Sequence, residues 1–503
     1  MTSVRRALAL SIAERYLLIA LALVSNILLA RMLTPEEIGI YSVSLAVIGI
    51  AHVLRDFGIG NFLIQEKHLT EAHIRTALGI SLLIGGTLFA MAYIAAPFVA
   101  GFYGEVQMQQ TLQISSLNFL TLPFCTISLA LLRREMAFKR LLWVNLLAAS
   151  TGFLVTIGLA YYGFGPNSMA IGAVVLNIVT GVGAWRARSD RKLLLPGFSM
   201  WRPVMNFGGQ NVAAGVVTTI AMDINDLAVG KILGMAPVAM ISRAQGLMNL
   251  FHRDVMGAIS NVAYPAFANT FRQQGDLESQ YIFSVASITA IAWPFYAFAS
   301  LFSLELIRLL FGHQWDDAAP LVPLFCLGGA IGATFSLIIP LLIAQGEIKR
   351  ATMINIIVQP LRAGVTVACV WYFQSMEAFA VTFLIVAFLA CPYFYYVKSK
   401  IQRNDFRLLL PALKKSAILT LLCSVFPVLI FFMAPRNDSG VALIFLIVAV
   451  VLCAIIWAYG IILLKHPLST DPIFTKLLQL LLGFFKTKQP PAKAGEFAPG
   501  AED

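Results

Sequence analysis

The 503-residue sequence is 59% hydrophobic and only 12% charged, and its mean hydropathy is +0.81. This composition predicts a polytopic membrane protein and excludes a large soluble domain. The net charge of +11 does not indicate a nucleic-acid-binding protein, because the basic residues cluster in short loops between apolar segments.

Length and hydropathy predict about fourteen membrane-spanning helices, so the expected fold class is an all-α polytopic membrane protein. The first apolar segment has no small-x-small cleavage site before Arg31, so we expect it to be retained and not removed as a signal peptide. The expected spans cover residues 8–30, 38–63, 74–100, 107–132, 141–162, 168–187, 203–232, 236–268, 281–311, 319–344, 351–373, 377–397, 414–434 and 441–464.

Basic residues occupy alternate loops between these spans, which indicates the orientation of the chain. With the N-terminus on the cytoplasmic side, 27 of the 36 Lys and Arg residues fall on that side. The opposite side keeps Arg31, Lys231, Arg308 and Arg436, of which Arg31 and Lys231 are expected to anchor helix ends at the membrane interface. Because cytoplasmic loops are enriched in Lys and Arg, the bias predicts that both termini are cytoplasmic.

Short motifs recur in the two halves of the chain. Residues 29–35 match residues 229–234 at an offset of 200, and Phe102-Tyr103-Gly104 matches Leu310-Phe311-Gly312. Six spans separate the members of each pair, so both halves enter the membrane in the same direction. A parallel repeat of this kind predicts two pseudo-symmetric six-helix lobes with a substrate site between them.

The repeat defines the expected domain organisation. An N-terminal lobe (1–187) and a C-terminal lobe (203–397) are joined by a cytoplasmic linker (188–202). A cytoplasmic connector (398–413) leads to two extra transmembrane helices (414–464), and a cytoplasmic tail (465–503) follows. Within the tail, residues 473–485 are too short to span a membrane and are expected to be interfacial, whereas residues 486–503 have the composition of a disordered segment.

A costly pair of charges occurs in each lobe. Arg55 and Asp56 lie within an apolar segment, and the same dipeptide returns 198 residues later as Arg253 and Asp254. An ionisable side chain near the bilayer centre costs roughly 2.5–3.5 kcal/mol on insertion scales, so such residues usually face a bundle interior or a wet cavity. The repetition therefore predicts a duplicated bundle with a charged interior.

Five arginines lie within the predicted spans and are the candidate substrate-binding residues. A guanidinium group matches phosphate oxygens bidentately, so these arginines predict a basic cavity for a diphosphate and acidic sugars. The alternative is structural ion pairing with Glu14, Asp56, Asp223, Asp226 and Asp254. The cavity is the favoured interpretation for Arg55 and Arg253, and it stays open for the others. The five candidates are Arg15, Arg55, Arg243, Arg253 and Arg362.

A second hypothesis assigns a coupling cation to Asp223 and Asp226, which share a helical face. Asn355, together with Gln359, could add oxygen ligands from another span. Arg362 lies one turn from Gln359 and would oppose a cation there, so an ion pair between Asp226 and Arg362 is the competing and slightly preferred interpretation.

No catalytic residue, cofactor or metal site is predicted. A Walker A run is absent, and the histidines and acids of residues 66–73 lack the spacing of metal ligands, which is typical of a solvated loop. The six cysteines lie in six different spans without a CxxC pair, so they are expected to be apolar packing residues.

Several motifs together resemble those of a known family. Residues 29–41 (LARMLTPEEIGIY), with DFGI at 56–59, look like the polysaccharide transporter, or oligosaccharide flippase, family of the multidrug/oligosaccharidyl-lipid/polysaccharide superfamily. So do residues 226–234 (DLAVGKILG) and 311–315 (FGHQW) ahead of 319–321 (APL). The resemblance covers about residues 1–465. It implies two six-helix lobes, alternating access, and movement of a lipid-diphosphate-linked glycan to the outer leaflet.

The resemblance also implies that the two extra helices form or flank a groove for a polyprenyl tail. The expected function is therefore a non-enzymatic flippase of lipid-linked oligosaccharides for polysaccharide biosynthesis, such as exopolysaccharide or lipopolysaccharide, in the bacterial inner membrane. Its expected partners are a polyprenyl-diphosphate-linked glycan, membrane lipids and the polysaccharide polymerase or export machinery, but not nucleic acid. The alternative is a cation-coupled multidrug antiporter of the same superfamily. A glycan polymerase is disfavoured, because the longest predicted outward loop is only about ten residues.

Overall fold

The computed structural model describes residues 2–55, 58–190, 195–202, 204–205, 220, 223–433, 439–470 and 474, and the ordered elements within them are helices. The expected all-α membrane fold is confirmed. Asp56 and nearly all of the predicted interfacial segment 473–485 lie outside the described residues.

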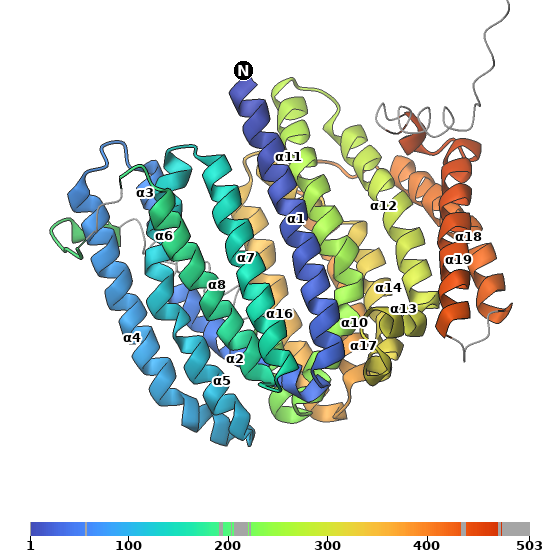
Figure 1. Cartoon of the computed structure of the whole chain (residues 1–503). Coiled ribbons are helices and arrows are strands. Elements are labelled where there is room, and N and C mark those ends of the chain that lie inside the picture. The colour runs from blue at the N-terminus through green and yellow to red at the C-terminus, as the bar shows by residue number, and fades with distance from the viewer. Residues whose placement is uncertain are drawn as a thin grey trace, which may run out of the picture.

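Two groups of helices lie side by side, with two further helices at the edge (Figure 1). The first helix group comprises α1 (Thr2–Met32), α2 (Pro35–Arg55), α3 (Ile59–Gln65), α4 (Glu71–Tyr103), α5 (Val106–Ser116), α6 (Asn118–Arg134), α7 (Phe138–Tyr161) and α8 (Pro166–Ala187). The second helix group comprises residues 223–232, α10 (Met235–Asn249), the π-helical turn η1 (Leu250–Val255), α11 (Met256–Arg272), α12 (Leu277–Leu301), α13 (Ser303–Leu310), the 3₁₀ turn η2 (His313–Leu321), α14 (Val322–Ala333), α15 (Ile338–Ala344), α16 (Ile348–Phe373) and α17 (Met376–Ser399).

Within the described residues, eleven helices are long and apolar enough to cross a membrane. They coincide with eleven of the fourteen expected spans. The other three expected spans are interrupted or incompletely described. Span 38–63 breaks between α2 and α3, where Gly58 has φ 68°, and span 236–268 contains the π-helical turn η1. Span 203–232 is described only in part.

The described members of the two charge pairs lie where the regular α-helix is interrupted. Arg55 is the last residue of α2, and Arg253 and Asp254 lie in η1. A π-helical turn inside an α-helix is rare and occurs frequently at functional sites. The side chains of Arg253 and Asp254 are outside the described part of the structure.

Local sequence signals account for several helix starts. Thr34 and Glu37 form a reciprocal cap at the start of α2, because the Thr34 N–H donates to the Glu37 carboxylate at 2.8 Å and the Glu37 N–H donates to Thr34 Oγ1 at 3.3 Å. Asp276 caps α12 by accepting from the Ser279 N–H at 3.0 Å, and this hydrogen bonding lowers the pKa of the Asp276 carboxyl.

The two further helices, α18 (Phe406–Met433) and α19 (Ser439–Leu463), lie beyond α12 at the edge of the second group (Figure 1). Thr289 of α12 and Ser416 of α18 are hydrogen-bonded at 2.9 Å, and Trp457 of α19 donates to the Ala290 carbonyl at 2.7 Å. The interface between these helices is otherwise apolar, so the two hydrogen bonds determine the position of α18 and α19 relative to α12.

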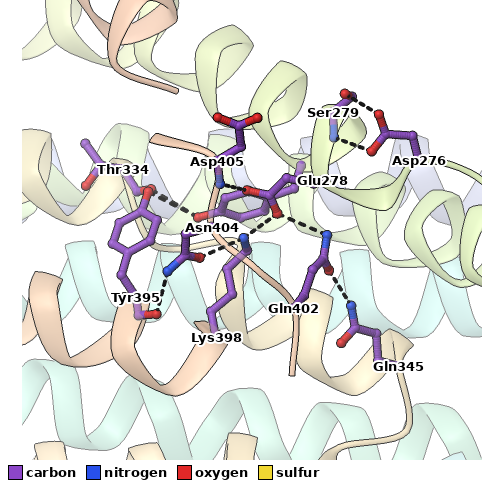
Figure 2. Close-up of polar contacts among 11 residues, drawn as sticks. Asp276, Glu278, Ser279, Thr334, Gln345, Tyr395, Lys398, Gln402, Asn404 and Asp405 are labelled. Atoms are coloured by element: carbon purple, nitrogen blue, oxygen red, sulfur yellow. Dashed lines mark hydrogen bonds and ion pairs between the residues drawn. The ribbon is translucent and has the colours of Figure 1, made fainter. Parts of the chain in front are cut away.

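A buried cluster joins α12 and α17 to the connector before α18, and we call it the Lys398 cluster (Figure 2). Lys398 is fully buried, donates to the Glu278 carboxylate and to Asn404 Oδ1 at 3.0 Å, and lies over the Tyr281 ring at 4.6 Å. Glu278 also accepts from Gln402 Nε2 at 3.0 Å and from the Asp405 N–H at 3.1 Å. The cluster therefore neutralises and hydrogen-bonds two charges that would be costly to bury alone.

His466, which follows α19, is fully buried and hydrogen-bonded through both ring nitrogens. The Leu468 N–H donates to Nδ1 at 3.1 Å, so the neutral ring carries its proton on Nε2, which donates to Ser416 Oγ at 3.0 Å. Burial and the nearby Lys415 charge lower the pKa of His466 to about 4.

This shift predicts that acid destabilises the protein. The unfolded chain binds the proton near pH 6.5 and the folded chain only near pH 4, so stability falls as pH decreases through this window, by up to about 3 kcal/mol. His466→Asn keeps an acceptor for Leu468 but cannot be protonated. We expect its apparent Tm in detergent to fall less than that of the wild type between pH 6.5 and pH 4. His68→Asn, at an exposed histidine, should leave the wild-type pH dependence in place, and an unchanged slope in His466→Asn would contradict the assignment.

Candidate substrate pathway between the two helix groups

The two helix groups are in tight contact at one end of the bundle, which we call the closed end. Helix α2 packs there against α10 so closely that a Cβ built at Gly39 would overlap the Met235 carbonyl oxygen. A Cβ at Gly230 would lie 2.7 Å from Val43. Buried apolar residues of both groups, including Leu33 and Ile241, form one continuous core at this end.

Two basic residues link the groups reciprocally at the closed end. Arg31, at the end of α1, donates to the Leu309 carbonyl of the second group at 2.5 Å. Lys231 of the second group donates to the Phe102 carbonyl of the first and lies 4.3 Å from the centre of the Phe102 ring. Arg31 and Lys231 match in the predicted repeat, and each donates to a backbone carbonyl of the opposite group. The prediction that these residues are only interfacial anchors is therefore incomplete, because each also joins the two groups.

Arg243, a candidate substrate-binding residue, also lies at the closed end. Its guanidinium donates to Asn26 Oδ1 of α1 at 2.9 Å and stacks about 5 Å from the rings of Phe311 and Trp315. Trp315 in turn donates to the Ala30 carbonyl at 2.8 Å. In this conformation Arg243 thus connects α1 to the second group.

The other candidate arginines whose side chains the structure describes do not form one cluster with Arg243, and the side chain of Arg253 lies outside the described part. Arg15 is exposed on α1, and the neighbouring Glu14 accepts from Asn145 of α7 at 2.6 Å. Arg55 is partly buried at the broken end of α2. Arg362 lies in the second group, where it lines a cavity together with Asn355, Gln359 and His252.

The acidic candidates are separated from Asn355. Asp223 faces the first group, because its Oδ2 lies 2.5 Å from the position of a Cβ at Gly49 on α2. Neither Asp223 nor Asp226 lines the cavity that contains Asn355 and Arg362. The suggested ion pair between Asp226 and Arg362 is wrong, since no such pair is present among the described residues.

A large apolar groove of about 880 Å³ lies between the second group and α18. Its wall consists of side chains from α12, α14, α17 and α18, among them Trp293, Leu327, Phe388, Leu413 and Ala417. No residue of α19 lines it. The family resemblance implied a groove at the two extra helices. Hydropathy could not show which of the two extra helices contributes to the groove, because both contain long apolar segments.

Comparison with known proteins agrees with this architecture. The chain is similar to a solved structure described as lipid II flippase MurJ in an inward closed conformation, with a TM-score of 0.73 and 14% identity, over 91% of this chain and 100% of that one. It is also similar to an inward-facing multidrug resistance MATE transporter of the MOP superfamily, with a TM-score of 0.61 and 14% identity, over 76% and 96% of the two chains. The fold of this polytopic membrane protein is thus similar to that of the two solved structures.

Sequence comparison identifies the family. The lipopolysaccharide biosynthesis protein WzxC of Escherichia coli is 23% identical over 350 residues, which are 68% of this chain and 70% of WzxC. Residues 28–320 match the model of a family described as polysaccharide biosynthesis protein, and the chain belongs to this family. The resemblance seen in the motifs is confirmed.

Proposed function

We propose that the protein moves a lipid-diphosphate-linked oligosaccharide from the cytoplasmic to the outer leaflet by alternating access between two lobes, the first and second helix groups. The charge bias of the loops supports a cytoplasmic location for both termini, and hence an outer location for the closed end that contains Arg31 and Lys231. In that orientation the described conformation is closed toward the outside, as a transporter is when it receives substrate from the cytoplasm.

The observation that carries this proposal is the apolar groove beside α18. A lipid-linked glycan needs an apolar path for its tail together with a polar path for its head group. The apolar lining of the groove suits a chain of methylenes and isoprene units, whose burial is favourable by roughly 25 cal/mol per Å². A multidrug antiporter has no requirement for such a groove outside the region between the lobes, so the groove favours the lipid-linked substrate.

The intramembrane arginines would serve the head group. Arg55 and Arg253 remain the favoured ligands of the diphosphate, because Arg55 lies at the end of α2 and Arg253 lies in the π-helical turn η1. Arg243 would become available when the closed end opens. Arg15, at an exposed position of α1, is the weakest of the candidates in this conformation. Asp223 and Asp226 remain the candidates for a coupling cation, without the help of Asn355.

Filling the groove tests the proposal. Ala417→Trp places an indole in the groove, and we expect it to cut export of the lipid-linked glycan severalfold while the protein level stays close to wild type. Val425→Trp, on an exposed part of the same helix that does not line the groove, is the matched control and should export normally. Export would be measured as surface polysaccharide and as accumulation of the lipid-linked precursor in the inner leaflet. Equal export by the two variants would contradict a role for the groove.

A further inference from the structure

The second helix group contains a small cavity whose lining combines polar and apolar side chains. It has a volume of about 270 Å³ and lies between η1, α14, α15, α16 and α17. Asn355, Gln359 and Arg362, at spacings of four and three residues, present one face of α16 to it, and His252 of η1 lines another side. Glycines on α14 leave the space open, since a Cβ at Gly332 would already lie 3.4 Å from the His252 ring.

The charge of the cavity is positive and uncompensated by its lining. No Asp or Glu belongs to the lining residues that the structure describes, and Arg362 forms no ion pair with any described residue. The comparable cavity of the first group, of about 380 Å³, differs in this respect, because its Arg188 is paired with Asp190. A guanidinium inside the membrane without a carboxylate partner is an unfavourable arrangement unless a ligand supplies the negative charge.

Two buried polar atoms at the cavity also lack partners. Neither His252 Nδ1 nor Gln359 Oε1 has a hydrogen-bond partner among the described residues. Leaving a buried polar atom unpaired costs about 1–3 kcal/mol, so a ligand that bonds to both atoms would recover this cost. An amide oxygen accepts a hydrogen bond, so the ligand needs a hydroxyl donor as well as a negative charge.

We infer that this cavity is a subsite for one acidic sugar residue of the transported glycan, an inference that rests on the proposed function. Its carboxylate would accept hydrogen bonds from Arg362, and its hydroxyls would bond to Gln359, Asn355 and His252. A volume of about 270 Å³ is just below the range of ligand pockets, about 300–1,000 Å³, so the cavity admits a single sugar unit and excludes a complete repeat unit. The donor set also explains why Asn355 is unsuited to a coupling cation, because Arg362 lies beside it.

The test is binding of D-glucuronate to the purified full-length protein in lipid nanodiscs, measured by calorimetry. We expect glucuronate to bind and glucose to bind at least about tenfold more weakly, because a hydrogen bond to a charged group contributes about 1.5–3 kcal/mol. Arg362→Gln should weaken glucuronate binding by a similar factor. Arg350→Gln is the matched control on the same helix, because Arg350 pairs with Glu347 outside the cavity, and it should bind as the wild type does.

Gly332→Val provides a second route if Arg362→Gln does not fold, because it fills the cavity without changing its charge; it should also weaken glucuronate binding. Unchanged binding in a folded Arg362→Gln or Gly332→Val protein would overturn the inference. Tighter binding of inorganic phosphate than of glucuronate would assign the cavity to a phosphate group instead and would overturn the acidic-sugar assignment.

Transport measurements keep this inference separate from the proposed function. If wild-type protein in vesicles moves no lipid-linked glycan, the proposed function fails. Glucuronate binding through Arg362 would then show only that the cavity is an anion site, and its assignment as a glycan subsite would be overturned. If wild-type protein moves the glycan but Arg362→Gln binds glucuronate normally, only the subsite fails. Loss of both glucuronate binding and export of an acidic glycan in Arg362→Gln supports both.

Discussion

Replacing Gly39 with valine is expected to abolish glycan export by preventing the closed end from forming. A Cβ at Gly39 would overlap the backbone carbonyl of Met235, and backbone on a packed helix cannot move aside as a flexible side chain can. The variant should therefore hold the lobes apart at this end. The protein then cannot adopt the conformation that is closed to the outside and receives substrate from the cytoplasm. We expect export to fall to near background while the protein still inserts and accumulates.

The measurement combines export with the accessibility of a cysteine at position 33. Leu33 is 2% exposed at the closed end, so a Leu33→Cys probe should resist a membrane-impermeant maleimide in otherwise wild-type protein. In Gly39→Val it should be labelled in spheroplasts. Gly86→Val is the matched control, because nothing lies within 4 Å of a Cβ at Gly86, and it should leave both export and probe protection unchanged. Protection of the probe in Gly39→Val would show that the close approach of α2 and α10 does not determine closure.

Among the substitutions considered, replacing Lys398 with alanine is expected to cause the largest loss of folding stability. The substitution leaves the Glu278 carboxylate, whose side chain is 16% exposed, without its charge partner in the Lys398 cluster. Removing one partner of a buried ion pair costs about 3–5 kcal/mol. It also frees the connector, since Asn404 and Gln402 are held through the same two charges. We expect a clearly lower apparent Tm in detergent and reduced abundance in the membrane.

Two further variants separate the ion pair from a general effect of losing a lysine. Lys400→Ala removes an exposed lysine two residues away, which lies 4.8 Å from the Tyr396 ring, and should change the apparent Tm little. Adding Glu278→Gln to Lys398→Ala removes the stranded charge and should restore part of the lost stability. If Lys398→Ala and Lys400→Ala have the same apparent Tm, the buried pair does not stabilise the fold.

The sequence by itself determined the fold class, the positions of eleven spans and the family. Apolar segments of membrane-spanning length are a property of local composition, so they can be read without knowledge of any contact. The start of α2 is equally local, because Thr34, Pro35 and Glu37 supply the cap and the first helical turn. The offset of 200 between Arg31 and Lys231 is equally readable from the sequence, since a repeat is a comparison of the sequence with itself.

Only the tertiary structure decided which of these residues meet. Hydropathy averages over the whole circumference of a helix, so it places Asp226 and Arg362 within the membrane but does not state which way either side chain points. The structure turns Arg362 into the cavity with His252 and leaves Asp226 outside it. Likewise, Arg31 and Lys231 bond to carbonyls of the opposite helix group, and Gly39 contacts Met235, through approaches between segments far apart in the chain. Such contacts depend on the rotation and crossing of packed helices, which no local pattern encodes.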